Sequence, residues 1–234
     1  MPGHPNHDRA DRILDAASEL LVRWGSRKVT IDDVARRAGI GKGTVYLHWR
    51  TKDVLFGALL TRAAADLLDR IATRLRTDPG EAVPHRYLRS LFLDVVHDPL
   101  LSAMLTNDVM LLGHYSDAAS ETRAAGVAAT DGTFEVFARH GLLRADVPDL
   151  PYALSAATIG FYLRDSADTA RADLTVEDRA DAMARVVRAA FEPPGEPDPA
   201  AVEAAATELR SVSEAYVSAC RAVIYTGESA TAPG

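Results

Sequence analysis

Four side chains able to donate hydrogen bonds to nucleic acid are concentrated in seven residues of this sequence. They are Lys42, Thr44, Tyr46 and His48. An ammonium group, two hydroxyls and an imidazole N–H can reach phosphate oxygens or the edges of bases. Patterns typical of catalysis, such as G-x-S-x-G, H-E-x-x-H and C-x-x-C, do not occur in the sequence. The residue types therefore favour binding over catalysis.

Two short helices are predicted to hold these side chains. The first has apolar residues at i, i+3, i+4 and i+7, namely Ile31, Val34, Ala35 and Ala38. Thr30 precedes it as an N-cap, and Gly39 follows where a left-handed C-cap residue costs least. The second helix turns Val45 and Trp49 inward and leaves the donors outside. Two helices joined by a tight glycine-containing turn form a helix-turn-helix unit, whose second helix enters the DNA major groove.

The stretch from Thr30 to Lys52 resembles the signature of TetR-type transcriptional regulators. It has the Thr at the helix start, Val-Ala ahead of Arg-Ala-Gly, the run Lys-Gly-Thr-Val-Tyr, an aromatic residue, and Lys-Asp at the start of the next helix. It departs from the family at two positions. Gly41 stands where the family usually has Ser, so the second helix lacks a side-chain cap, and Trp49 replaces the usual Phe with a larger ring.

The resemblance implies that one face of this unit meets DNA. Tyr46 would donate its hydroxyl to a phosphate, and Lys52 with its helix start would hold another. Lys42, Gly43 and Thr44 would approach base edges. The alternatives are a core position for Tyr46 and a solvated surface position for His48. The implied DNA-binding residues are Thr30, Lys42, Gly43, Thr44, Tyr46, His48 and Lys52.

The charge distribution agrees with a DNA-binding N-terminus, although the whole chain carries −7. Residues 1–52 contain ten basic and six acidic side chains, a balance of +4, which leaves −11 on residues 53–234. Counterion release requires a local basic surface, not a basic protein. The asymmetry predicts a DNA-binding head, residues 9–52, and a helical body with another task, residues 53–225.

Composition excludes several other classes of protein. No apolar run is long enough to span a membrane, and no secretory signal pattern opens the sequence, so we expect a cytoplasmic protein. The only cysteine, Cys220, rules out an intrachain disulfide and a cysteine-based zinc site. A phosphate-binding loop at Gly39–Thr44 fails because Arg36 and Gly43 stand where the pattern requires Gly and Ser or Thr. We expect no metal and no cofactor.

Helical patterns continue to the C-terminal part of the chain, so the predicted fold is all-α. Helices are expected at 11–24, 52–77, 81–97, 99–107, 109–114, 116–140, 150–168, 176–191 and 199–225, with disorder at residues 1–8 and after 226. The last of these has a stripe with alternating spacings of three and four: Val202, Ala205, Leu209, Val212, Tyr216, Ala219 and Val223. Packing within the chain and packing across a dimer both explain this stripe.

The family resemblance further implies that the body binds a small-molecule effector. Residues that mix apolar bulk with polar groups, as ligand sites do, are candidates for it, although each is also a plausible core residue. They are Met104, Asn107, Met110, His114, Tyr115, Phe134, Phe137, Tyr152, Phe161, Tyr162 and Arg164. Helices 150–168 and 176–191 are the dimer-interface candidates implied by the family.

The sequence thus predicts a ligand-responsive repressor that binds a palindromic DNA operator as a homodimer and is released by a small molecule. An activator of the same family is one alternative. A helical ligand-binding protein or enzyme with an incidental helix-turn-helix is the other.

Overall fold

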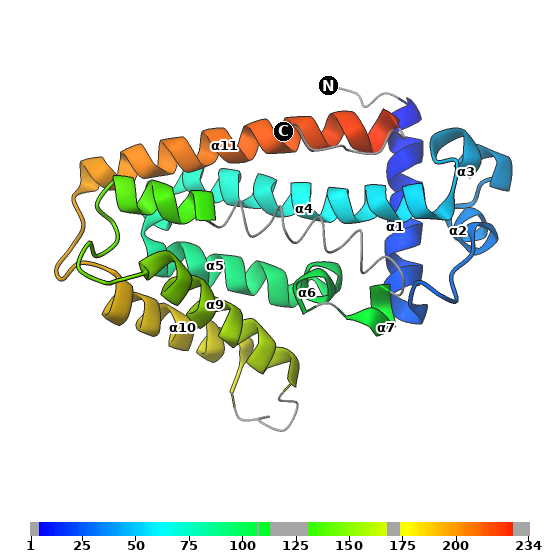
Figure 1. The fold of residues 1–234 in the computed structure, drawn as a ribbon. Helices are drawn as coiled ribbons and strands as arrows, with labels where there is room; N and C mark the ends of the chain where they lie inside the picture. The colour runs from blue at the N-terminus through cyan, green and yellow to red at the C-terminus, as the bar shows by residue number, and fades with distance from the viewer. Residues whose placement is uncertain (1–4, 107, 113–130, 168–173, 227–234) are drawn as a thin grey trace. The chain divides into compact units, whose positions relative to one another are not determined.

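The computed structural model describes residues 5–106, 108–112, 131–167 and 174–226, and every regular element in these ranges is helical (Figure 1). This confirms the all-α prediction. The elements are α1 (Pro5–Trp24), α2 (Ile31–Ala38), α3 (Lys42–His48), α4 (Lys52–Thr77), the 3-10 helix η1 (Pro79–Ala82), α5 (Pro84–His97), α6 (Pro99–Thr106), α7 (Val109–Leu112), α9 (Leu150–Ala167), α10 (Val176–Phe191) and α11 (Pro199–Thr226). Residues 131–139 are helical as well.

Two predicted boundaries were wrong. Helix α1 begins at Pro5, within the segment expected to be disordered, because Pro suits a first helical turn and Asp8 complements its positive end. The helix expected from residue 81 begins instead at Pro84, after η1, which Asp78 caps through a bond from the Gly80 N–H at 2.9 Å. Helices α4 and α10 begin and end at the predicted residues.

The predicted stripe on α11 holds only in its first half. Val202, Ala205 and Leu209 are buried as expected, but Val212 is 62% exposed and Tyr216 39% exposed. The buried face continues instead through Ser213, Val217, Cys220 and Ile224. A strict seven-residue spacing drifts by about 20° per heptad on a straight α-helix, so the face that is buried moves by one residue.

The chain divides into two compact units, which we describe separately. The first comprises residues 1–66, 99–123 and 216–234, and the second comprises residues 67–98 and 124–215. Both α4 and α11 contribute residues to each unit.

In the first unit, α1 packs against α2, and α2 packs against α3. The centre of this three-helix head is apolar, with Ile13, Leu14, Val34 and Val45 completely buried. Helix α7 is attached to the turn after α1, because Ser26 donates its N–H to the Leu111 carbonyl at 2.8 Å and its hydroxyl to the Leu112 carbonyl at 2.7 Å.

In the second unit, α10 packs on α5 and α9. Tyr87 meets Phe137 edge-on, with ring centroids 5.4 Å apart, and Phe92 meets Tyr162 at 5.0 Å. The Asp94 carboxylate lies between Arg70, at 3.3 Å, and Arg74, at 2.6 Å. This unit therefore combines an aromatic core with a partly exposed cluster of one carboxylate and two guanidinium groups.

Candidate nucleic-acid interface

Helix α2 starts in a complete capping box, which confirms Thr30 as its N-cap. The Thr30 hydroxyl accepts the Asp33 N–H at 3.2 Å, and the Asp33 carboxylate accepts the Thr30 N–H at 3.0 Å and hydroxyl at 2.6 Å. These bonds stabilise the charged carboxylate and hold the pKa of Asp33 below its usual value. Thr30 remains exposed, so its outer surface stays accessible.

The turn between α2 and α3 uses its glycine as predicted. Gly39 has φ 68° and ψ 37°, a left-handed conformation that costs glycine least, and its N–H points to the carbonyls of Ala35 and Arg36. Gly41 is the N-cap of α3 and makes no side-chain cap. The orientation of α3, the candidate recognition helix, therefore depends on contacts made by residues after its first turn.

Only one side of α3 is anchored. Val45 and the C-cap Trp49 are 0% and 1% exposed. Tyr46 is 42% exposed, which excludes a core position for its ring. Thr44 and His48 are half-buried at the edges of the outer face, so less of each is available than the sequence indicated.

Leu47 is the prominent residue of this face that sequence reasoning missed. It is 86% exposed, and it follows Gly43 by four positions, so the two lie on one side of the helix together with Tyr46. A helical projection of residues 42–48 would have found it. Its methyl groups offer an apolar contact of the kind that thymine methyl groups receive in the major groove.

Lysine charges at this face already have partners within the chain. The Lys42 ammonium lies 3.0 Å from the Asp32 carboxylate, which raises the pKa of Lys42 through a hydrogen bond and opposite charge. Lys52 donates to the Ser26 carbonyl at 2.6 Å and lies 5.4 Å from the centre of the Phe56 ring. Burial lowers the pKa of Lys52. Lys52 thus ties the start of α4 to the turn after α1.

His48 lies against the indole of Trp49, with ring centroids 5.4 Å apart. Burial, and secondarily the charge of Arg9, hold the pKa of His48 below its usual value. The imidazole is therefore neutral at pH 7 and offers one N–H donor.

The sequence that forms this face is similar to known bacterial regulatory proteins. Residues 13–59 match the family described as bacterial regulatory proteins, tetR family. The chain is 29% identical over 143 residues to the HTH-type transcriptional activator FasR of Mycolicibacterium smegmatis, a match that covers 60% of this chain and 64% of FasR. The chain thus spans less than two thirds of that relative's length.

Solved structures show the same fold. A regulator from Saccharomonospora viridis in complex with choline superimposes with a TM-score of 0.60 at 21% identity, covering 80% of this chain and 99% of that one. The regulator FadR from Bacillus subtilis in complex with stearoyl-CoA superimposes with a TM-score of 0.56 at 14% identity, covering 75% and 96%. The match to the tetR family therefore covers residues 13–59, and the likeness to these structures shows the fold of the chain.

The described effector-binding candidates are divided between the two units. Met104 is buried in the first unit, and the others whose side chains are described belong to the second. There Phe134, Phe137 and Tyr162 are buried, Phe161 is half-buried, and Tyr152 is 78% exposed. Residues 107, 114 and 115 and the side chains of Met110 and Arg164 lie outside the described part of the structure.

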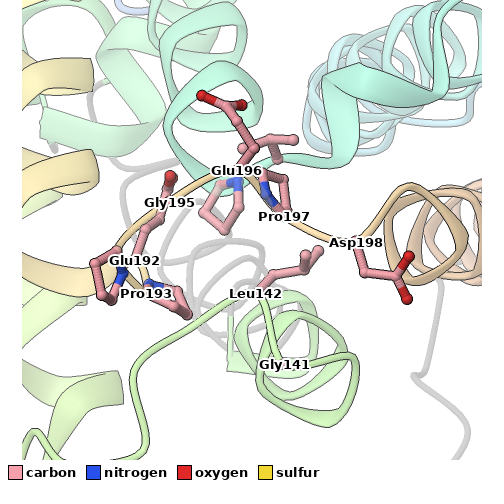
Figure 2. Close-up of a pocket in the computed structure, with 11 residues that line it drawn as sticks. Gly141, Leu142, Glu192, Pro193, Gly195, Glu196, Pro197 and Asp198 are labelled. Carbon is pink, nitrogen blue, oxygen red and sulfur yellow. The ribbon is translucent and has the colours of Figure 1, made fainter.

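One pocket of the second unit, of about 180 Å³, lies beside the α10–α11 connection (Figure 2). Val83, Leu142 and four prolines line it together with Glu192, Glu196 and Asp198. Each carboxylate already serves the chain: Glu192 accepts the His85 N–H at 2.6 Å, Glu196 lies 3.0 Å from Arg188, and Asp198 accepts the Ala200 N–H at 3.1 Å. The pocket shares no residue with the predicted effector site.

Two further observations concern the described ranges of the chain. No group of three or more His, Cys, Asp and Glu side chains in them is arranged to hold a metal ion. No helix among them is both long enough and apolar enough to cross a membrane.

Proposed function

We propose that this tetR-family protein is a DNA-binding transcriptional regulator, with residues 9–52 as its DNA-binding domain and residues 53–225 as its effector-binding and dimerisation domain. The observation that carries the proposal is the one-sided anchoring of α3. Val45 and Trp49 are buried, whereas Gly43, Tyr46 and Leu47 are exposed. A helix that keeps a tyrosine and a leucine in solvent beside basic residues is suited to the major groove.

The DNA-binding residues that we propose remain those of the motif: Thr30, Lys42, Gly43, Thr44, Tyr46, His48 and Lys52. Leu47 joins them as an apolar base contact. Exposed Arg27, Lys28 and Arg50 add local positive charge for phosphates.

A homodimer on a palindromic operator follows from the small number of base pairs that one such helix can contact. Apolar side chains exposed on α9 and α10 support these two helices as the interface. Tyr152, Ile159 and Leu163 on α9 are 78%, 38% and 50% exposed, and Val186 on α10 is 41% exposed. A second copy would remove this apolar surface from water.

A small-molecule effector is supported by likeness to regulators solved with choline and with stearoyl-CoA. Among the candidates, the buried aromatic residues Phe134, Phe137 and Tyr162 are the best placed to surround an apolar ligand. The effector would bind one of two body states better and change the spacing of the two heads of the dimer through α4. Release of DNA would make the protein a repressor acting in the cytoplasm, without enzymatic activity. Activation, as performed by FasR, is the alternative.

The test is a gel shift at fixed salt with the DNA upstream of the protein's own coding sequence. Tyr46→Phe and Lys52→Ala should weaken binding to every sequence, and Lys42→Ala should also alter sequence preference. Unchanged binding for all three variants would overturn the DNA assignment and favour an enzyme or carrier. A reporter gene driven by the same DNA separates repression from activation.

A further inference from the structure

The recognition helix is too short to fix its own direction. Helix α3 has seven residues and no side-chain cap at Gly41. Isolated helices need roughly 12–15 residues to be even marginally stable in water, so its orientation depends on what holds its buried side. Val45 and the C-cap residue Trp49 are both buried in the head. Trp49 also makes a hydrogen bond outside the three head helices.

That second contact comes from the end of the chain. The Trp49 indole Nε1 donates to the backbone carbonyl of Ile224 at 3.3 Å, in a buried position 175 residues away in sequence. Ile224 lies in the last turn of α11, where carbonyls have no partner within the helix. One bond thus satisfies both a buried indole N–H and an orphan carbonyl.

The next residue attaches the same turn to α1. The Tyr225 hydroxyl donates to Asp11 Oδ1 at 2.7 Å. Burial and the neighbouring Asp11 raise the pKa of Tyr225 to about 12, so its hydroxyl keeps its proton at neutral pH. Asp11 is also reached by Arg62, whose Nη1 lies 3.4 Å from the Asp11 carbonyl oxygen.

The C-terminal part of α11 buries an apolar face. Val217, Cys220 and Ile224, spaced by three and four residues, are 4%, 6% and 1% exposed. All belong to the first unit, where the red end of α11 lies beside the blue helix α1 (Figure 1). The segment 217–225 is therefore built into the head and is not a loose end.

We propose that residues 217–225 of α11 act as a clamp that positions the recognition helix: Trp49 fixes the C-terminal end of α3 to it, and Tyr225 fixes it to α1. The clamp sets DNA affinity without touching DNA. A phenylalanine at position 49 fills most of the space but leaves the Ile224 carbonyl without its donor, so α3 loses its fixed direction relative to α1. This inference rests on the proposed DNA binding. The effect of the clamp on α3 can be measured separately, by amide hydrogen exchange in the free protein.

Two pairs of matched variants test the clamp. Trp49→Phe is compared with Trp24→Phe, the same exchange at the chain's other tryptophan, which is 41% exposed. Asp11→Ala is compared with Asp11→Asn. Both remove one negative charge from the head, and only Asn keeps an acceptor for the Tyr225 hydroxyl. Charge effects on DNA binding therefore cancel in the second pair.

Each variant is titrated with the DNA upstream of its coding sequence, and amide hydrogen exchange is measured on the free protein. We expect Trp49→Phe to bind on the order of tenfold more weakly than Trp24→Phe, and Asp11→Ala severalfold more weakly than Asp11→Asn. Amides of residues 44–48 should exchange faster in Trp49→Phe and Asp11→Ala, while those of 13–21 in α1 stay protected.

Equal affinities within both pairs, or unchanged exchange in α3, would overturn the clamp. Faster exchange throughout α1, α2 and α3 would also overturn it, since that result is general destabilisation of the head. If even the unaltered protein fails to bind the DNA, the proposed function fails, and the exchange of residues 44–48 alone decides whether the clamp holds α3.

Discussion

The ammonium of Lys42, in the first turn of α3, lies 3.0 Å from the carboxylate of Asp32, in the first turn of α2. Both side chains are at least half exposed, so this pair bridges the two helices of the motif on the surface. A DNA phosphate approaching Lys42 must therefore compete with Asp32 and is repelled by it.

Asp32→Asn should tighten DNA binding. Exposed ion pairs contribute little, so releasing Lys42 from its partner should raise affinity by up to about fivefold at low salt. Titrations at two salt concentrations check this, because the gain must shrink as salt screens it. Asp8→Asn, which removes an exposed charge from α1, is the control. An equal gain in both variants would mean that net charge, and not the pair, is responsible.

Gly43→Ala should change stability and DNA binding in opposite directions. A Cβ at Gly43 meets no atom within 4 Å, so nothing inside the protein requires a glycine in this helix. Alanine should raise the free energy of unfolding by about 0.4–1 kcal/mol, measured by urea denaturation. DNA affinity should fall, because a methyl group would stand between the α3 backbone and the base edges.

The matched control is Gly57→Ala in α4, where a Cβ also meets no atom within 4 Å. It should give a similar gain in stability with unchanged DNA affinity. If Gly43→Ala binds DNA as well as Gly57→Ala does, the backbone of α3 does not approach DNA closely at this point.

Thr30→Ala and Thr175→Ala should separate stability from function. Thr30 with Asp33, and Thr175 with Asp178, form two complete capping boxes, on α2 and α10. Loss of either cap should lower the free energy of unfolding by about 1 kcal/mol. Only Thr30→Ala should also weaken DNA binding, measured by gel shift at matched folded fractions. Equal binding by the two variants would remove Thr30 from the interface.

The same two capping boxes predict that the folded state loses stability at acid pH. Hydrogen bonds from the Thr residues lower the pKa of Asp33 and of Asp178 below the ordinary 3.8. Their stabilisation is therefore complete above pH 3.8 and is lost as the pH falls through the lowered folded-state values. Thermal melting as a function of pH measures this loss, which should be smaller in Thr30→Ala. A melting curve for that variant that runs parallel to the wild-type curve would contradict it.

The local chemistry of the motif was predictable from the sequence because its signals are short-range. Thr30, Gly39 and Gly41 each act on neighbours within four residues, and all three behave as expected. The stripe on α11 failed because its register depends on packing of the whole helix, where small drifts per turn accumulate.

Long-range contacts were beyond the sequence for a different reason. Nothing in the residues near Trp49 indicates that its indole donates to the Ile224 carbonyl. Every residue has a backbone carbonyl, so the residue type at position 224 does not reveal the acceptor. The effector residues had no local signal either: apolar bulk is the same whether a side chain packs in a core or against a ligand. Phe137, packed edge-on against Tyr87, illustrates this.

Lys52 has two roles that can be separated by experiment. It was predicted to hold a phosphate, and it donates to the Ser26 carbonyl at 2.6 Å from a partly buried position. Lys52→Met keeps a long apolar side chain at this position and removes the ammonium group that donates to Ser26 and lies over the Phe56 ring. We expect the free energy of unfolding to fall by about 1 kcal/mol, because a partly exposed bond to a charged group contributes less than a buried one.

The salt dependence of DNA binding then decides whether Lys52 also meets phosphate. Loss of one phosphate contact reduces the slope of log affinity against log salt by about 0.9, whereas loss of an internal bond lowers affinity without changing that slope. Lys42→Met is the control, since its ammonium is exposed and pairs only with the surface carboxylate of Asp32 among the contacts observed for it. It should reduce the slope without lowering stability measurably. A Lys52→Met slope equal to that of the unaltered protein would restrict Lys52 to joining the start of α4 to the turn after α1.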